Sequence, residues 1–416
     1  MNSQNPILAK QDDKKPYPDF KSAKFLNSHI QSILNFYAPN IKDDSGGFFH
    51  NFKDDGSLFN PGERHLVSSC RMVFVFCKAY ELFGDEQHLA LAQHGVDYIR
   101  EHHWDYNRKG YNWTLTDGHV ANDQTNHCYG LAFVVLSFAA AHQAGIKDAK
   151  DDLERAYNIM EQRLWDSSIG LYADEASADW STVTRYRGQN ANMHSCEAMI
   201  AAYEATNDAK YLNRAYELAQ TVSVKLADKS DGLIWEHFTQ ELDIDWQYNK
   251  DDPKNLYRPW GFQPGHQTEW TKLLLTLHQH KPEYWMIERA KFLFDRAMEV
   301  CWDNKNGGIL YGFAPDNTIC DDDKYFWVQA ETLAAAARLK AITGDDSYDQ
   351  WYEKIWQYAW DYMIDHKHGA WYRVLTVDNQ KTSDQKSTAG GKCDYHTLGA
   401  CWDVLRIMKQ SLVMRF

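Results

Sequence analysis

The sequence predicts an all-α fold in which six helix pairs close into an (α/α)6 barrel. A short motif of glycine beside aromatic or aliphatic residues recurs six times along the 416 residues. Between the motifs, apolar residues recur at the i, i+3, i+4 and i+7 spacing of amphipathic helices. A fixed repeat length indicates one helix pair and one turn in each repeat. The motif glycines are separated by 63, 60, 62, 76 and 61 residues: Gly47, Gly110, Gly170, Gly232, Gly308 and Gly369.

The predicted helices follow one another in a regular order. Each glycine motif follows an odd-numbered helix and precedes an even-numbered one. Glycine beside aromatic and aliphatic residues at these points predicts tight β-hairpins at one end of the fold. We expect inner helices around an axis and outer helices covering them. The pattern gives about twelve helices, beginning near residues 21, 65, 87, 123, 149, 193, 209, 266, 285, 325, 347 and 397.

An open α-solenoid is the alternative to a closed ring. Closure is favoured because there are six copies and no polar capping repeat at either end. No Pro/Ser-rich linker interrupts the chain. The sequence therefore predicts a single catalytic domain over residues 1–416, with a polar N-terminal extension at residues 1–20.

Composition and charge exclude several classes of function. A formal net charge of −14 argues against nucleic-acid and anionic-membrane partners. The longest apolar run, "YGLAFVVLSFAAA", is about 13 residues and too short to span a bilayer. The N-terminus has no apolar signal-peptide region and the eight cysteines form no CxxC pair, so we expect reduced thiols in a cytoplasmic protein. The phosphate-binding patterns GxGxxG and GxxxxGK[ST] are absent. No heptad seam is present, and we expect a monomer or a homodimer.

The repeat that begins at Gly232 is longer than the others. Its extra residues fall in "EHFTQELDIDWQYNKDDPKNLYRPWGFQP", which is polar and has no helical period. Long loops in compact domains are usually lids or binding loops. We predict a flap over one end of the barrel.

A set of polar and aromatic side chains follows the motif glycines at related distances. Equivalent positions in a ring of repeats point to the same place, so these side chains should converge at one mouth of the barrel. Alone, a histidine such as His127 is more often structural, and Arg71 could belong to a buried ion pair. The shared register favours a site. The set comprises Arg71 (24 residues after its glycine), His127 (17), His194 (24), His266 (34, including the flap), Trp327 (19), Glu331 (23) and His396 (27).

Three chemistries compete for this set. His194–Glu197 and His266–Glu269 are HxxE pairs that could hold a metal, although zinc sites more often use other spacings. Glycoside hydrolysis needs two flanking carboxylates, and the register supplies only Glu269 and Glu331 as acids. Proton transfer next to a carbonyl fits best. Neutral histidine is a suitable base near pH 7, a helix start favours the neutral ring, and an arginine stabilises an enediolate oxygen.

Five segments together resemble the N-acylglucosamine 2-epimerase superfamily, and most closely its aldose–ketose isomerase branch. They are "HLVSSCRM", "YRGQNANMHSCEA", "PGHQTEW", "WVQAE" and "DYH", in this order. The resemblance covers nearly the whole chain. It implies an (α/α)6 barrel, no cofactor or metal, and interconversion of sugars through a cis-enediolate.

The resemblance also implies roles for individual residues. His396 matches the base that takes the C2 proton, and His266 matches a second acid–base histidine that assists ring opening. Glu269 would orient or hydrogen-bond this pair of histidines. Arg71 matches the residue that binds the carbonyl and enediolate oxygens. The remaining matches are substrate-binding residues: Asn190 and His194 for hydroxyl groups, Trp327 as an aromatic wall, and His127 near a matched segment.

We expect a neutral hexose because a sulfonate or phosphate would need a further Arg or Lys. The expected reaction is D-mannose to D-fructose, with D-lyxose to D-xylulose as a second activity. The alternative is a mannose/glucose 2-epimerase, which returns the proton to the other face of C2. Two further alternatives are a glycoside hydrolase and a non-catalytic sugar-binding protein. The sequence leaves the roles of Arg258 and Lys392 open.

Overall fold

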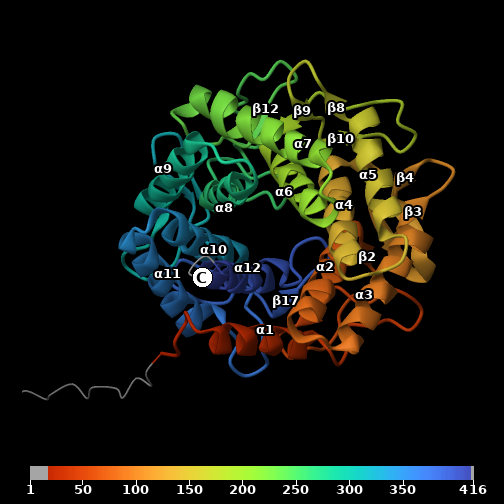
Figure 1. The fold of residues 1–416 in the computed structure, drawn as a ribbon, viewed down its shortest axis with the longest axis horizontal. Helices are drawn as coiled ribbons and strands as arrows, with labels where there is room; N and C mark the ends of the chain where they lie inside the picture. The colour runs from red at the N-terminus through yellow and green to blue at the C-terminus, as the bar shows by residue number, and fades with distance from the viewer. Residues whose placement is uncertain (1–16, 414–416) are drawn as a thin grey trace, which may run out of the picture.

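The computed structural model describes residues 17–413, and within this range twelve helices form a ring of six pairs (Figure 1). Helix α12 contacts α2, which closes the ring and confirms the barrel over the open solenoid. The inner helices are α2 (Leu66–Phe83), α4 (Cys128–Gln143), α6 (Gln189–Thr206), α8 (Pro264–His280), α10 (Phe326–Thr343) and α12 (Tyr395–Val413). The outer helices are α1 (Ala23–Tyr37), α3 (Glu86–Tyr98), α5 (Ala149–Arg163), α7 (Ala209–Gln220), α9 (Tyr284–Cys301) and α11 (Asp346–Tyr358).

Burial explains which helices lie inside the ring. Nearly every residue of α4 is buried, as expected for a helix that is apolar on all sides. The outer helix α7 buries only one stripe, formed by Tyr211, Ala215, Leu218 and Ala219. This contrast between the helices of a pair follows directly from the sequence.

Short polar turns connect an inner helix to the next outer helix. Helices α2 and α10 end at Gly84 and Gly344, which adopt the left-handed conformation with φ of 65° and 75°. Glycine reaches this conformation without strain. The following residues, Asp85 and Asp345, cap α3 and α11 by accepting a hydrogen bond from a backbone N–H. These turns hold each helix pair antiparallel.

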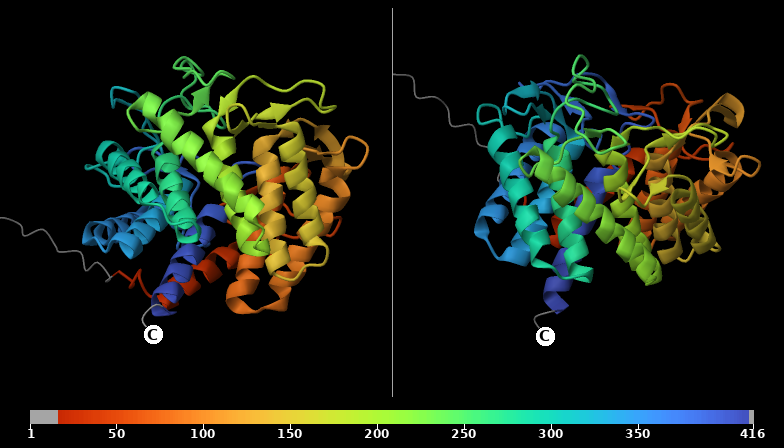
Figure 2. Two further views of the ribbon diagram at one scale, coloured as in Figure 1. Left: turned by 45° about the horizontal axis from the view of Figure 1, so that its top comes forward. Right: turned by 90° about the horizontal axis from the view of Figure 1, so that it is seen from above.

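Short strands and loops gather at one end of the ring (Figure 2). The strands before α6 are β1 (Phe52–Lys53), β2 (Arg64–His65), β3 (Trp104–Asp105), β4 (Gly110–Tyr111), β5 (Thr114–Thr116), β6 (Val120–Asp123), β7 (Asn126–His127), β8 (Trp165–Asp166), β9 (Leu171–Tyr172), β10 (Glu175–Ala176) and β11 (Arg187–Gly188). The later strands are β12 (His237–Phe238), β13 (Gly312–Phe313), β14 (Ile319–Asp321), β15 (Lys324–Tyr325), β16 (Val374–Leu375) and β17 (Gln385–Ser387). Single turns of π- or 3₁₀-helix are η1 (Ile99–His103), η2 (Asp117–His119), η3 (Thr221–Leu226), η4 (Ala227–Ser230) and η5 (Ala359–Met363).

The strands join neighbouring repeats at this rim. The strand that leads into an inner helix pairs with a strand that follows the next glycine motif, as in β2 with β5, β7 with β10, β11 with β12 and β15 with β16. Pairing of β17 with β1 completes the circle between the last and first repeats. The rim therefore fixes where each inner helix begins.

Five of the six glycine motifs form the predicted hairpins. Two are strand pairs, β3 with β4 and β8 with β9, and three are closed by the single bridges Lys42–Phe48, Trp302–Ile309 and Ile364–Trp371. The motif at Gly232 differs from the prediction, because a 3₁₀ turn at Ala227–Ser230 precedes it. Helix α4 begins later than predicted, at Cys128, because residues up to His127 form strands.

Most of the predicted N-terminal extension, residues 1–16, lies outside the described residues. Among the described helices, none combines the length and apolar character needed to cross a membrane. Residues 239–263 contain no helix, and the segment Leu256–Pro259 within this predicted flap lines a cavity at the rim.

Candidate active site

One cavity of about 540 Å³ opens at the strand end of the barrel. The first turns of the inner helices and the flap form its wall. The cavity is lined by all eight predicted site residues: Arg71, His127, Asn190, His194, His266, Glu269, Trp327 and His396. Glu331, the remaining member of the predicted register, lies behind His396 and does not line the cavity.

His396 is the second residue of α12 and is held from behind by a carboxylate. Its Nδ1 lies 2.7 Å from Oε1 of Glu331 on α10, and its Nε2 lies 3.5 Å from a guanidinium nitrogen of Arg71. Burial, followed by the positive charge of Arg71, holds the pKa of His396 well below 6.5. The ring is therefore neutral near pH 7. With Nδ1–H donated to Glu331, Nε2 keeps a lone pair and can act as a base.

His266 is held in the same way, by a residue that sequence analysis did not identify. Its Nδ1 lies 2.9 and 3.0 Å from the two carboxylate oxygens of Glu236, which directly precedes β12. Gln189 donates to Glu236 over 2.9 Å, and Trp270 donates to Gln189 over 2.8 Å. This chain of hydrogen bonds fixes the carboxylate and leaves Nε2 of His266 as the nitrogen available to a substrate.

The Pro264–Gly265 break positions His266 against an aromatic wall. Proline at the start of α8 suits the first helical turn, where no intrahelical N–H partner is needed. A Cβ atom at Gly265 would lie 2.5 Å from the ring of Trp327, so only glycine fits there. The ring of Trp327 lies 5.1 Å from His266 and 5.8 Å from His396, between centroids. Three successive inner helices therefore present two histidines with an indole between them.

Arg71 is buried without an ion pair. It donates to the hydroxyl of Tyr129 over 2.9 Å. Its guanidinium lies 4.4 Å from the ring centroid of Phe133 and 5.2 Å from that of Tyr395. Among residues 17–413, no carboxylate lies within 4.0 Å of it. A buried arginine without a counter-ion suits a site where negative charge develops on a substrate oxygen.

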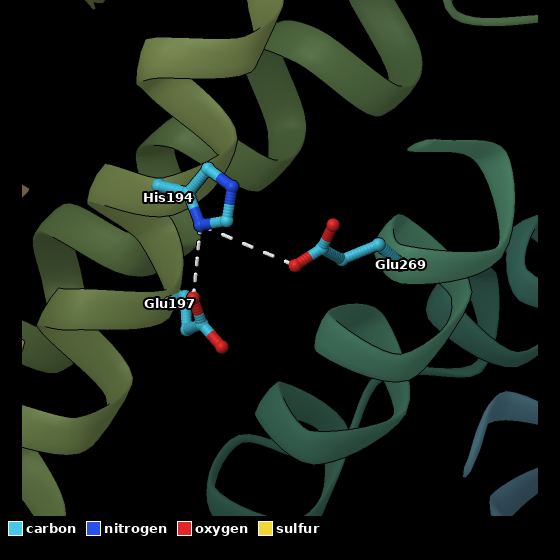
Figure 3. A group of neighbouring side chains, drawn as sticks. All are labelled: His194, Glu197 and Glu269. Atoms are coloured by element: carbon cyan, nitrogen blue, oxygen red, sulfur yellow. Dashed lines mark hydrogen bonds and ion pairs between the residues drawn. The ribbon is translucent and has the colours of Figure 1, made fainter. Parts of the chain in front are cut away.

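Glu269 does not hydrogen-bond His266, in contrast to the expectation from the resemblance. One turn further along α8, it approaches Nδ1 of His194, with 4.0 Å between the atoms (Figure 3). His194 is bonded instead to Glu197, at 3.0 Å. Oε1 of Glu269 is buried without a hydrogen-bond partner among the described residues, as is Oδ1 of Asn190. Burial, followed by repulsion from Glu331, raises the pKa of Glu269 well above its usual value. A neutral carboxyl here can donate a hydrogen bond to a sugar hydroxyl.

The rim carries a fourth histidine–carboxylate pair. Nδ1 of His127 lies 3.3 Å from Glu175, which also accepts a hydrogen bond from Arg258 over 3.0 Å. These contacts, that of His127 first, lower the pKa of Glu175 to about 2 although burial opposes the shift. His127 stacks on Trp113 with ring centroids 4.1 Å apart. Arg258 is thus already paired, and its charge is balanced.

Lys392 is not part of the cavity wall. Its side chain is fully buried, and its ammonium pairs with the carboxylate of Asp394 and lies 5.0 Å from the ring centroid of Phe326. Its role is therefore to hold the loop before α12, where His396 begins the helix. The sequence alone could not distinguish this structural role of Lys392 from a role in binding the sugar.

The residues that sequence analysis missed share a backbone position. The first N–H of four inner helices donates to the carbonyl of a residue three or four positions after the next motif glycine, over 2.8 to 3.1 Å. Strand pairing between repeats thus carries these side chains to the helix start. These residues could have been found in the sequence by their position, three or four residues after a motif glycine. The four residues are Trp113, Asp174, Glu236 and Arg373, and all line the cavity.

Several side chains beside and behind the cavity could act as metal ligands, and a lysine already lies among them. Two overlapping groups have donor atoms within 4.8 Å of one another: His194, Glu197 and Glu269, and Glu269, Glu331 and His396. The ammonium of Lys272 contacts Glu331 and lies 3.8 Å from Glu197. Lys272 thus already supplies one cation to these carboxylates. His266 is in neither group, because it binds Glu236. The absence of a metal remains a prediction.

The same contacts bear on glycoside hydrolysis. One oxygen of Glu331 is held by His396 and the other by Lys272. A general acid must instead face the glycosidic oxygen. Glu331 therefore lies behind His396 and does not line the cavity, which leaves Glu269 as the one acid of the register on the cavity wall. A single carboxyl group of the register at the wall favours proton transfer by imidazole over glycoside hydrolysis.

Comparison with known proteins agrees with this geometry. The N-acylglucosamine 2-epimerase (GlcNAc 2-epimerase) family matches residues 47–400. The D-mannose isomerase of Marinomonas mediterranea is 51% identical over 393 residues, covering 94% of this chain and 99% of that protein. A crystal structure of a D-mannose isomerase superposes with a TM-score of 0.92 at 50% identity, covering 94% of this chain and 100% of that one. A cellobiose 2-epimerase from Bacillus thermoamylovorans shares the fold, with a TM-score of 0.82 at 21% identity over 92% of this chain and 100% of that one. The chain belongs to the N-acylglucosamine 2-epimerase family.

Proposed function

We propose that this protein is an aldose–ketose isomerase that interconverts D-mannose and D-fructose, and also D-lyxose and D-xylulose. The observation that carries the proposal is the pair His266 and His396, each bound at Nδ1 by a carboxylate and separated by Trp327. The choice of sugar is supported by the 51% identity to a D-mannose isomerase over nearly the whole chain.

In the proposed reaction, Nε2 of His396 removes the proton from C2 of the open-chain aldose. The electron pair of the C2–H bond forms the C1–C2 double bond of a cis-enediolate, and Arg71 stabilises the negative oxygen. The proton held by His396 is returned to C1, the proton of the C2 hydroxyl passes to the negative oxygen on C1, and the carbonyl of the ketose forms at C2. His266 acts as the second acid–base group and protonates the ring oxygen during opening. No cofactor takes part.

Other residues of the cavity hold the sugar. The neutral carboxyl of Glu269 donates to a hydroxyl group, and Asn190 and His194 bind further hydroxyl groups. Trp327 provides an apolar face for the carbon chain, and His127 closes the rim. Burial of these side chains excludes water from the enediolate, which would otherwise protonate it.

The first test is the product formed from D-mannose. We expect D-fructose as the main early product, with deuterium entering the C2 position of recovered mannose in D2O. Glucose as the main early product would contradict isomerisation and favour the 2-epimerase alternative. No product and no exchange would favour a sugar-binding protein.

Substitution of the two histidines tests their roles. We expect His396→Ala and His266→Ala to lower kcat by roughly 10²–10⁴-fold, the usual contribution of a general acid or base. His396→Ala should abolish C2 exchange, whereas His266→Ala should retain a trace. Unchanged melting temperatures are the control. Full activity in both variants would refute the assignment.

The proposal extends to the setting of the enzyme. The ring and its rim act as a single catalytic domain, because all six repeats contribute to one core and one cavity. A cytoplasmic location is supported by the eight cysteines, all of them free thiols. The working form is a monomer or a homodimer.

A further inference from the structure

Four charged side chains cluster behind His194 and His396, and of these four only Glu269 lines the cavity. This cluster consists of Glu197 on α6, Glu269 and Lys272 on α8, and Glu331 on α10. Three carboxyl groups thus share one lysine. Their side chains are 13%, 1% and 3% exposed and that of Lys272 is 14% exposed, so water screens the cluster only weakly.

Lys272 touches the carboxylates that hold the histidines. Its ammonium contacts Oε2 of Glu331, whose Oε1 binds Nδ1 of His396 at 2.7 Å. It also lies 3.8 Å from Glu197, which binds Nδ1 of His194 at 3.0 Å. Lys272 lies behind both histidines and is not among the residues that line the substrate cavity. It can therefore act on the reaction only through the carboxylates.

The charge state of Glu331 decides where His396 carries its proton. An ionised Glu331 accepts Nδ1–H, so Nε2 keeps the lone pair that attacks the substrate proton. A protonated Glu331 would donate to Nδ1, and the ring proton would then lie on Nε2, where it blocks the base. Burial raises the pKa of Glu331, and Lys272 is the strongest opposing influence.

The other groups around Glu331 do not replace this charge. Glu197 repels a negative charge there, and Glu269 faces the same cluster. Arg71 on α2 lies on the cavity side of His396. Tyr395 donates to Glu197, over 2.7 Å, and His194 is neutral because burial lowers its pKa. Among the described residues, Lys272 is the cation in direct contact with Glu331.

We propose that Lys272 is a positioning residue: it keeps Glu331 ionised, and Glu331 thereby keeps the proton of His396 on Nδ1. This inference rests on the proposed isomerase. It assigns to the lysine the task of setting the tautomer of the base, without contact to the sugar.

The test is the pH dependence of kcat in Lys272→Met, which keeps the aliphatic stem and removes the charge. We expect kcat at pH 7 to fall at least ~10-fold with KM changed less than about twofold, because a base in the wrong tautomer loses much of its catalytic effect. The loss should be relieved as the pH rises toward 9 and Glu331 ionises again. Lys272→Arg should retain most activity at pH 7.

Two further variants separate this role from a structural one. Glu331→Gln should show a comparable loss at pH 7 but no recovery at pH 9, because an amide cannot ionise. Lys78→Met is the matched control: Lys78 is a buried lysine of α2 that binds Glu81 and Gln143, away from both histidines. It should keep the wild-type pH profile. A loss in Lys272→Met that is equal at all pH values, or a wild-type profile, would overturn the inference.

The tautomer can also be observed without substrate. In ¹⁵N-histidine NMR near pH 7, His396 should carry its proton on Nδ1 in the wild type and on Nε2 in Lys272→Met. Lys272→Gln provides the same comparison if the methionine variant does not fold. An unchanged tautomer would overturn the inference. Failure of the wild type to convert mannose would instead contradict the proposed function, while this NMR comparison would still decide the role of Lys272.

Discussion

A histidine that acts as a base needs its proton on the ring nitrogen that faces away from the substrate. In this protein a carboxylate lies at a histidine Nδ1 four times, as Glu331 with His396, Glu236 with His266, Glu197 with His194 and Glu175 with His127. The carboxylates that hold His396 and His266 come from different elements than these two histidines. His396 and His266 are therefore fixed by contacts that form only when the repeats pack together.

Glu236→Gln tests whether the carboxylate bound to Nδ1 of His266 contributes to catalysis. We expect kcat to fall roughly 10- to 100-fold with little change in KM, because an amide cannot stabilise the imidazolium form of His266 during proton transfer. Glu175→Gln is the control, since Glu175 also binds a histidine Nδ1, at 3.3 Å, but at the rim. It should mainly raise KM. Steady-state kinetics on mannose decide the matter, and equal effects on kcat in both variants would contradict the assignment.

The flap is the element that completes the cavity. Arg258 holds the flap to Glu175 over 3.0 Å, and Lys254 fastens it to the end of β14 and the residues after it. The ammonium of Lys254 lies 2.8 Å from Asp323, 3.2 Å from Asp321 and 3.5 Å from Asp322. This lysine lies two residues before the segment Leu256–Pro259 that lines the cavity. The ion-pair cluster therefore sets the position of that part of the wall.

Lys254→Ala should loosen the flap. Because exposed ion pairs contribute up to about 1 kcal/mol, we expect KM to rise by up to ~5-fold with kcat nearly unchanged. Cleavage by chymotrypsin at Tyr257 should become faster. Lys250→Ala is the control, since Lys250 lies over Trp260 and has no carboxylate within 4.0 Å among the described residues. Similar KM values in wild type and Lys254→Ala would show that the flap is held by other contacts.

At the scale of the whole molecule, many histidines are buried in the neutral form. Burial lowers the pKa of His29 to about 4, of His65 to about 3 and of His103 to about 4. In all, the pKa is lowered in nine of the described histidines. It is raised in five described carboxyl groups, which act in the opposite direction. The histidines outnumber them.

Acid should therefore begin to destabilise the fold at a pH well above the range in which carboxylates usually titrate. Below pH 6.5 the unfolded chain binds protons that the folded chain excludes, so stability falls as the pH decreases toward 4. His29, His65 and His103, whose pKa values lie at about 3 to 4, each contribute up to about 1.4 kcal/mol per pH unit in this window. We expect the melting temperature to decrease from pH 7.5 to 5, and to decrease less in His29→Gln. A constant melting temperature over this range would contradict the prediction.

The sequence by itself determined the repeat, the helices and the direction in which the first turns of the inner helices point. Local periodicity and glycine spacing carry this information, since helix and turn preferences depend on residues close in the chain. His266, His396, Arg71 and Trp327 were found because the repeat length places them in one register. All four line one cavity, and their roles in it stay a prediction.

Only the tertiary structure decided which partner each side chain has. Glu236 reaches His266 because β12 pairs with β11 of the preceding repeat and aligns Glu236 with the start of α6. The resemblance implied that Glu269 orients or hydrogen-bonds His266 and His396, yet it lies one turn deeper along α8 than His266, near His194. Lys272 gained its role only when α6, α8 and α10 enclosed one space. Contacts between distant segments depend on ring closure and burial, and no local pattern in the chain encodes them.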